Sequence, residues 1–76
     1  MSTPHELHEE FPGKVDKIHA LKQEDAHFRH LADAYHEANR AVHRAETRAE
    51  PVSEEEEQRL RRERARLKDE IARRLA

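Results

Sequence analysis

The segment AEPVSEEEEQ, residues 49–58, separates two long helical patterns in this 76-residue chain. Pro51 cannot continue a helix, because proline lacks the backbone N–H and its ring clashes with the preceding turn. Ser53 and Glu56 have the spacing of a capping box, in which the serine accepts a hydrogen bond from the amide three residues later. The segment therefore predicts a turn over residues 49–53 and a second helix that begins near residue 54.

Apolar residues recur on both sides of this turn at alternating steps of three and four, which is typical of helices that pack along one stripe. Residues 14–48 contain no proline or glycine and predict a first helix. Its stripe consists of Ile18, Leu21, Phe28, Ala32, Tyr35, Val42 and Ala49, and the stripe of the second helix, residues 54–75, consists of Leu60, Leu67, Ile71 and Leu75. Two helices joined by so short a turn must run antiparallel. The predicted fold is all-α, a coiled-coil-like helical hairpin.

Three polar residues are expected in the seam between the two helices. Asp25 and Asn39 occupy positions where apolar residues are expected, and polar groups at such positions commonly fix helix register. Counting outward from the turn places Arg64 beside Asn39, so the guanidinium can donate to the amide carbonyl. The same count places Ala38 beside Ala65, which predicts a close approach of the helices there.

Residues 1–12 form a separate N-terminal segment, and the hairpin domain is expected over residues 13–76. Thr3, Pro4 and Glu6 have the pattern of a short helix start. The FPG sequence at residues 11–13 then interrupts, because proline disfavours a helical conformation in the residue before it.

Composition limits the functions that this chain can have. With 42% charged and 34% hydrophobic residues and a net charge of −2, the chain offers no whole-molecule attraction for nucleic acid or anionic membranes. It has no cysteine, its N-terminus lacks the profile of a secretory signal, and its apolar runs are too short to cross a bilayer. We therefore expect a cytoplasmic protein without membrane partners. Without a catalytic constellation or a cofactor motif, we expect no enzymatic activity and no cofactor.

The apolar stripe is wider than one hairpin needs, so part of it is expected to remain exposed unless a partner covers it. The first helix is also longer than the second, which leaves its first turns without a partner inside the hairpin. These features predict a homodimer or higher homo-oligomer that forms a four-helix bundle, or a protein client. The predicted interface consists of Val15, Ile18, Leu21, Phe28, Leu31, Tyr35, Leu67, Ile71 and Leu75.

Seven histidines suggest two alternative functions. His27 and His30, one helical turn apart and with Asp33 nearby, are candidate ligands for zinc or nickel, although their outward position favours a solvated face. His36 and His43 border the seam near Arg40 and Arg44, so their protonation is expected to weaken association at acidic pH. A further alternative is weak nucleic-acid binding through the arginines of the second helix, but these arginines form no single stripe and alternate with acidic residues.

Several segments resemble the YdcH-like family of small bacterial proteins. They are FP at residues 11–12, LKQED at 21–25, HFRHLADAYHE at 27–37 and RLKDEI at 66–71. The resemblance implies a cytosolic bacterial helical hairpin of no assigned activity, with no catalytic or cofactor residues to carry over. The family pattern has an aspartate at the position of Asn39 and large apolar residues at those of Ala38 and Ala65, so the seam of this chain is thinner and less charged.

Overall fold

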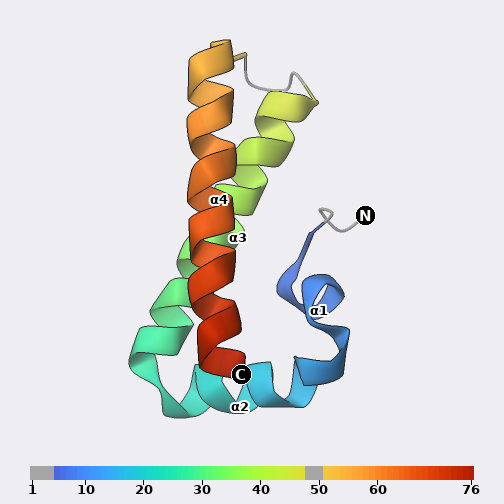
Figure 1. Cartoon of the computed structure of the whole chain (residues 1–76), viewed down its shortest axis with the longest axis vertical. Helices are drawn as coiled ribbons and strands as arrows, with labels where there is room; N and C mark the ends of the chain where they lie inside the picture. Colours follow the sequence, from blue (N-terminus) through green and yellow to red (C-terminus); the bar gives the residue numbers. More distant parts are fainter. Residues whose placement is uncertain (1–4, 48–50) are drawn as a thin grey trace.

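The computed structural model describes residues 5–47 and 51–76, and every regular element in these ranges is helical. In chain order the elements are α1 (Leu7–Glu10), the 3-10 helix η1 (Pro12–Lys14), α2 (Val15–Glu24), α3 (Ala26–Glu46) and α4 (Glu54–Leu75) (Figure 1). The long helices α3 and α4 pack against each other as antiparallel arms joined at one end by the turn. The all-α hairpin predicted from the sequence is confirmed.

Helix α4 has the predicted bounds because its termini carry the expected signals. The Ser53 hydroxyl accepts a hydrogen bond from the Glu56 amide at 3.1 Å. Glutamates fill the first turn, and Arg73 and Arg74 lie in the last turn, so both ends complement the helix dipole. The Glu56 carboxylate forms an ion pair with Arg59.

The first long helix is broken at Asp25, so the prediction of one helix over residues 14–48 is wrong. Asp25 has φ −126° and ψ 105°, and its side chain accepts hydrogen bonds from the amides of His27 and Phe28. It is therefore the N-cap of α3 and not a register residue of the seam. The physical reason is that aspartate is among the best N-cap residues and a poor residue for a helix interior. Helix α3 ends at Glu46, and the expected end at Arg48 lies outside the described residues.

The break allows α2 to cross the end of the hairpin opposite the turn, which we call the open end (Figure 1). The ammonium group of Lys17 in α2 donates a hydrogen bond to the carbonyl of Leu75, near the C-terminus, at 3.1 Å. Helix α1 then returns beside the hairpin. A short N-terminal helix is present as α1, but it begins at Leu7 with Glu6 as its N-cap, later than the predicted start near Pro4. Pro12 follows the end of this helix and starts η1. Thr3 and Pro4 lie outside the described residues.

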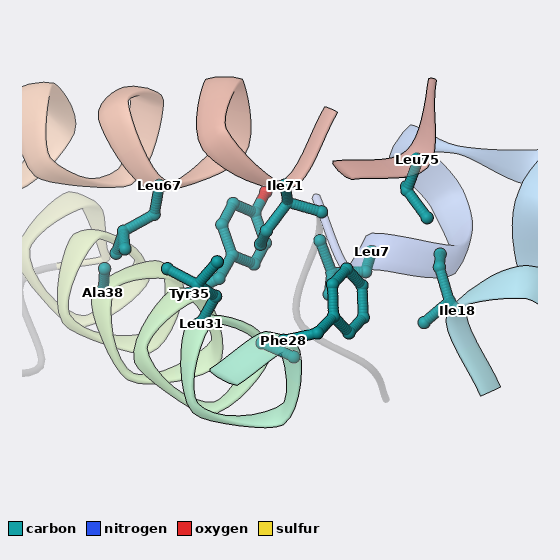
Figure 2. Packing of buried hydrophobic residues seen from close by; sticks show 10 residues of the cluster. Leu7, Ile18, Phe28, Leu31, Tyr35, Ala38, Leu67, Ile71 and Leu75 are labelled. Carbon is teal, nitrogen blue, oxygen red and sulfur yellow. The ribbon is translucent and has the colours of Figure 1, made fainter. Parts of the chain in front are cut away.

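The core is concentrated at the open end, where side chains from four helices meet (Figure 2). Five residues of the predicted interface, expected to be partly exposed, are buried within the single chain. They are Phe28, Leu31, Tyr35, Ile71 and Leu75. Ile18 and Leu21, expected to lack partners, also contact this core, and Ile18 is only 7% exposed. The expected exposure is wrong because the N-terminal residues fold back over the stripe.

Of two contacts predicted for the seam between the helices, the polar one is present and the apolar one is absent. The guanidinium Nη1 of Arg64 donates to Oδ1 of Asn39 at 3.0 Å, as the count from the turn predicts. Ala65, in contrast, is exposed, and the buried side chain of Ala38 faces Leu67 (Figure 2). The helices therefore do not meet through a pair of alanines.

Candidate functional site: a covered apolar surface at the open end of the hairpin

The candidate site is the apolar surface that α3 and α4 form together at the open end, which we call the open-end surface. Its residues are Phe28, Leu31 and Tyr35 of α3 and Leu67, Ile71 and Leu75 of α4. Within each helix they are spaced three or four residues apart, so they share one face of that helix. The two faces together form a continuous apolar area that is wider than either helix alone.

Residues 5–24 lie over this surface, and we call them the N-terminal cover. Leu7 of α1 and Ile18 of α2 are 3% and 7% exposed and belong to the same cluster as the open-end surface (Figure 2). Phe11 and Leu21 are partly buried against it. Burial of a leucine or isoleucine side chain contributes about 1.5–3 kcal/mol. The cover is therefore held mainly by apolar contacts of two residues and supported by two more.

Polar contacts fix the orientation of the cover at its N-terminal end. The buried Tyr35 hydroxyl donates a hydrogen bond to the backbone carbonyl of His5 at 2.6 Å. His5 itself has φ 66°, a left-handed conformation that few residues other than glycine adopt. The Nδ1 atom of His36 lies 2.9 Å from Oε2 of Glu6. These contacts join the first described residues of the chain to the middle of α3.

A third polar contact joins the cover to α4. The ammonium group of Lys68 donates to Oε1 of Glu10 at 2.9 Å, and the same oxygen lies 3.3 Å from Nδ1 of His5. The hydrogen bond from Lys68 is the main cause that lowers the pKa of Glu10, with a smaller contribution from His5. Glu10 is therefore a stable anion at neutral pH. An acidic edge of the cover thus faces a basic residue of the hairpin.

The environment of Tyr35 makes it a structural hydrogen-bond donor at neutral pH. Burial is the main cause that raises its pKa to about 12, and the negative charges of Glu10 and Glu6 act in the same direction, while Arg64 opposes them. A phenol with so high a pKa stays protonated over the physiological range. Its hydroxyl therefore remains available to hold the His5 carbonyl.

Two shallow grooves lie on the surface of the helices, one beside the cover and one near the turn. One, of about 90 Å³, lies between the cover and α3, with Leu7, Val15 and Ile18 as its apolar lining and three histidines and a lysine around it, namely His8, His19, His36 and Lys22. The other, of about 220 Å³, lies near the turn and includes Val52, which is 38% exposed, and the half-buried Leu60. The first groove shows that the cover does not fill every gap beside the hairpin.

The structure places the histidines that were considered as metal ligands or pH-sensitive groups. His27, His30 and Asp33 are exposed on α3, and the described residues contain no group of three or more histidine, aspartate or glutamate side chains placed to hold a metal ion. The close partner of His36 is the Glu6 carboxylate of the same chain. The expected weakening of association through His36 and His43 stays a prediction.

The arginines of α4 are largely paired with neighbouring acids. Arg61 contacts both Glu57 and Glu46, at 2.7 and 3.0 Å, and Arg66 contacts Glu63 at 2.7 Å. Such pairs neutralise part of the charge that a phosphate backbone would require. Among the described residues, no helix is both long and apolar enough to cross a membrane.

The sequence prediction included the hairpin half of the site and missed much of the cover. Ile18 and Leu21 were expected to meet a second subunit or a client helix, and they instead contact the hairpin of their own chain. Leu7 and Phe11 were not identified as interface residues, although apolar residues four apart in a polar segment are a signal for a short helix with one buried face. No local sequence signal pairs Glu10 with Lys68.

Fold and site together define a helical hairpin protein whose open end is covered by its own N-terminal segment. Residues 28–75 match the family model described as "Protein of unknown function (DUF465)". This match spans more than half of the chain, so the protein belongs to the DUF465 family, which is the YdcH-like family, and the resemblance is confirmed. The match begins in the first turn of α3 and ends with α4, so it contains the hairpin and none of the cover. No curated protein and no solved structure matches the chain.

Proposed function

We propose that this protein is a non-enzymatic helical interaction module and that its hairpin binds an amphipathic helix at the open-end surface. One observation carries the proposal: this surface already holds helical segments of the chain, and these segments lie outside the residues that match the family model. The hairpin is thus a binding unit, and the cover is its ligand in the same chain. We propose the cytoplasm as its compartment, in line with a sequence that contains no cysteine.

The contacts of the cover indicate the chemistry of a partner helix. Leu7 and Ile18 supply large aliphatic side chains to the core, and Glu6 and Glu10 supply carboxylates to His36 and Lys68. A partner helix would therefore carry an aliphatic face with acidic residues at its border. Helix-in-groove recognition of this kind depends on a few apolar anchors spaced along one helix face.

The polar groups of the site support binding over catalysis. The Tyr35 hydroxyl donates to the His5 carbonyl, and burial raises its pKa to about 12, far from the range in which a general acid or base works at neutral pH. Glu10 is committed to Lys68. Both groups hold segments together, which is the role expected of polar residues at the border of an apolar interface.

A peptide titration tests the proposal. The full chain with Leu7→Ser and Ile18→Ser has a weakened cover, and a fluorescent peptide of residues 5–24 with the native sequence is added to it. The matched control peptide carries the same two serines, so length and charge are equal. We expect the native peptide to bind at least about tenfold more tightly, because two buried aliphatic side chains contribute about 1.5–3 kcal/mol each.

Circular dichroism of the variant establishes that the hairpin is still helical before the titration is interpreted. A substitution of the exposed Ala20 by serine serves as the protein control, because it keeps the cover closed and should leave the peptide largely unbound. Equal anisotropy for the native and serine peptides on a helical variant would overturn the proposal. Binding of the native peptide alone would support it.

A further inference from the structure

Asp25 is a one-residue hinge between α2 and α3. On its N-terminal side the Asp25 amide donates to the Leu21 carbonyl at 2.8 Å, which is a helical hydrogen bond. On its C-terminal side the Arg29 amide donates to the Asp25 carbonyl at 3.0 Å, which is also helical. The helical pattern is therefore interrupted only for the three amides between them, those of residues 26–28.

The broken and the straight forms of this hinge differ by few hydrogen bonds. In the structure, Oδ1 of Asp25 accepts from the amides of His27 and Phe28 at 3.0 and 3.1 Å. In a straight helix, the amides of residues 26–28 would donate to the carbonyls of residues 22–24. Straightening thus exchanges two side-chain hydrogen bonds for three backbone hydrogen bonds. In the structure, Asp25 Oδ2 also lies 3.6 Å from Nη1 of Arg74.

The residues on both sides of the hinge are compatible with one continuous helix. Residues 15–46 contain no proline and no glycine, and the three- and four-residue spacing of the stripe continues through the hinge region, with Asp25 itself at a stripe position. Helix propensity therefore does not oppose straightening, and the N-cap at Asp25 is the main local feature that opposes it. A straight helix would carry the N-terminal cover away from its own hairpin and expose the open-end surface.

We propose that a second copy of this chain covers that surface through exchange of the N-terminal covers. In this swapped dimer, α2 and α3 of each chain form one helix over residues 15–46, and each cover docks on the open-end surface of the other chain. The inference rests on the proposed function, because the same surface must accept a helix from another molecule. It names the partner and the conformational change that admits it.

The contacts of the cover are the same in both forms, which is the physical basis of domain swapping. The Tyr35–His5 and Lys68–Glu10 hydrogen bonds and the burial of Leu7 and Ile18 would form between chains with the geometry they have within one chain. Only the hinge changes its structure. The balance between monomer and dimer is then set by the hinge and by protein concentration.

The first test changes the hinge and measures the mass of the full chain by native mass spectrometry and analytical ultracentrifugation. Asp25→Ala removes the cap and favours the straight helix, and loss of a cap corresponds to about fivefold per chain. Because a dimer contains two hinges, we expect the dimerisation constant to rise about 25-fold. Asp25→Ser retains a capping oxygen and should behave like the wild type, and Asp33→Ala makes the same chemical change at an exposed site of α3.

The second test identifies which chain each cover contacts. A carbodiimide joins the Glu10 carboxylate to the Lys68 amine, which lie 2.9 Å apart, as an amide with loss of water. The dimer fraction of Asp25→Ala is prepared from equal amounts of normal and ¹⁵N-labelled chains, mixed under conditions that allow exchange, and cross-linked. In a swapped dimer every such link joins two chains, so half of the linked peptide pairs would contain one normal and one labelled peptide.

The outcomes separate this inference from the proposed function. A larger dimer fraction for Asp25→Ala with mixed-isotope links supports the swap. A dimer whose links all join peptides of one isotope, or an Asp25→Ala variant that stays as monomeric as Asp33→Ala, overturns it, and the peptide titration can still succeed in both cases. If Asp25→Ala does not fold, mixed-isotope links in concentrated wild-type protein decide the question, and their absence there refutes the inference. Failure of the native peptide to bind would instead overturn the proposed function.

Discussion

Replacement of Tyr35 by phenylalanine removes the hydroxyl that holds the N-terminal cover and leaves the ring in place. The hydroxyl is buried and donates to the His5 carbonyl at 2.6 Å. A hydrogen bond of this kind contributes about 0.5–1.5 kcal/mol in net terms. Because His5 is exposed, water can hydrate its carbonyl after the change, so no full penalty for a buried unpaired acceptor applies. We expect Tyr35→Phe to lower the free energy of unfolding by about 1 kcal/mol and the melting temperature by about 4–8 °C.

The same substitution has a second signature at alkaline pH. The pKa of Tyr35 is about 12 in the folded chain, against 10.0 for an unperturbed tyrosine, so the folded state holds the phenolic proton more tightly than the unfolded state. The corresponding stability is fully present below pH 10 and is lost as the pH rises from 10 to 12. A pKa difference of this size corresponds to about 3 kcal/mol. Tyr35→Phe lacks the hydroxyl and cannot lose this contribution. The free energies of unfolding of the two proteins should therefore converge and then cross as the pH rises from 10 to 12.

The chain contains one tyrosine and no tryptophan, so absorbance of the tyrosinate at 295 nm reports Tyr35 alone. Urea denaturation followed by circular dichroism gives the free energies at each pH, and hydrogen exchange shows which amides lose protection. A matched control is Thr47→Val, which removes another side-chain hydrogen bond to a backbone carbonyl, at 2.9 Å, far from the cover in the chain. Exchange in residues 5–24 should rise only for Tyr35→Phe. A tyrosinate midpoint near pH 10 in the folded protein, or equal stability of Tyr35→Phe and wild type at pH 7, would refute this account of Tyr35.

Two further predictions concern charged groups. Arg64→Ala and Asn39→Ala should show a coupling of about 1–2 kcal/mol in a double-mutant cycle, because they remove the two ends of one charge-assisted hydrogen bond, and additive urea midpoints would contradict this. Glu10→Gln should flatten the acid limb of the stability curve. The pKa of Glu10 is lowered in the folded chain, so its contribution to stability is present above the unfolded value of 4.5 and is lost as the pH falls through the folded value. An acid limb identical to that of the wild type would contradict the pairing with Lys68, and Glu9→Gln serves as the control.

The hairpin could be predicted from the sequence because its signals are local and agree with one another. Pro51 predicts the end of the first helix, Ser53 caps the second, and the apolar spacing assigns one face to each helix. Once the turn is placed, the positions opposite each other follow by counting, and the Arg64–Asn39 contact is correct on that basis. The same count failed for Ala38 and Ala65, because a small error in helix rotation moves an alanine from the interface to the solvent.

The cover could not be predicted, because its stability depends on contacts between residues far apart in the chain. Leu7 lies in a four-residue helix, which is too short to form in isolation and exists here because its leucine enters the core at the open end. Glu10 and Lys68 are 58 residues apart, and nothing in the local sequence of either one indicates the other. The expected exposure of the stripe was wrong for the same reason.

Asp25 shows why the break in the first long helix was not predicted. Its position in the apolar spacing fits a polar seam residue of a continuous helix, and its residue type fits an N-cap equally well. Local sequence therefore supports both forms, and the choice depends on the side-chain hydrogen bonds to the amides of His27 and Phe28 and on the burial of Leu7 and Ile18. In the proposed swapped dimer, the same apolar contacts would form with a second chain. Concentration and the cap at Asp25 should thus decide between the two forms, and a change as small as Asp25→Ala should be enough to shift the balance.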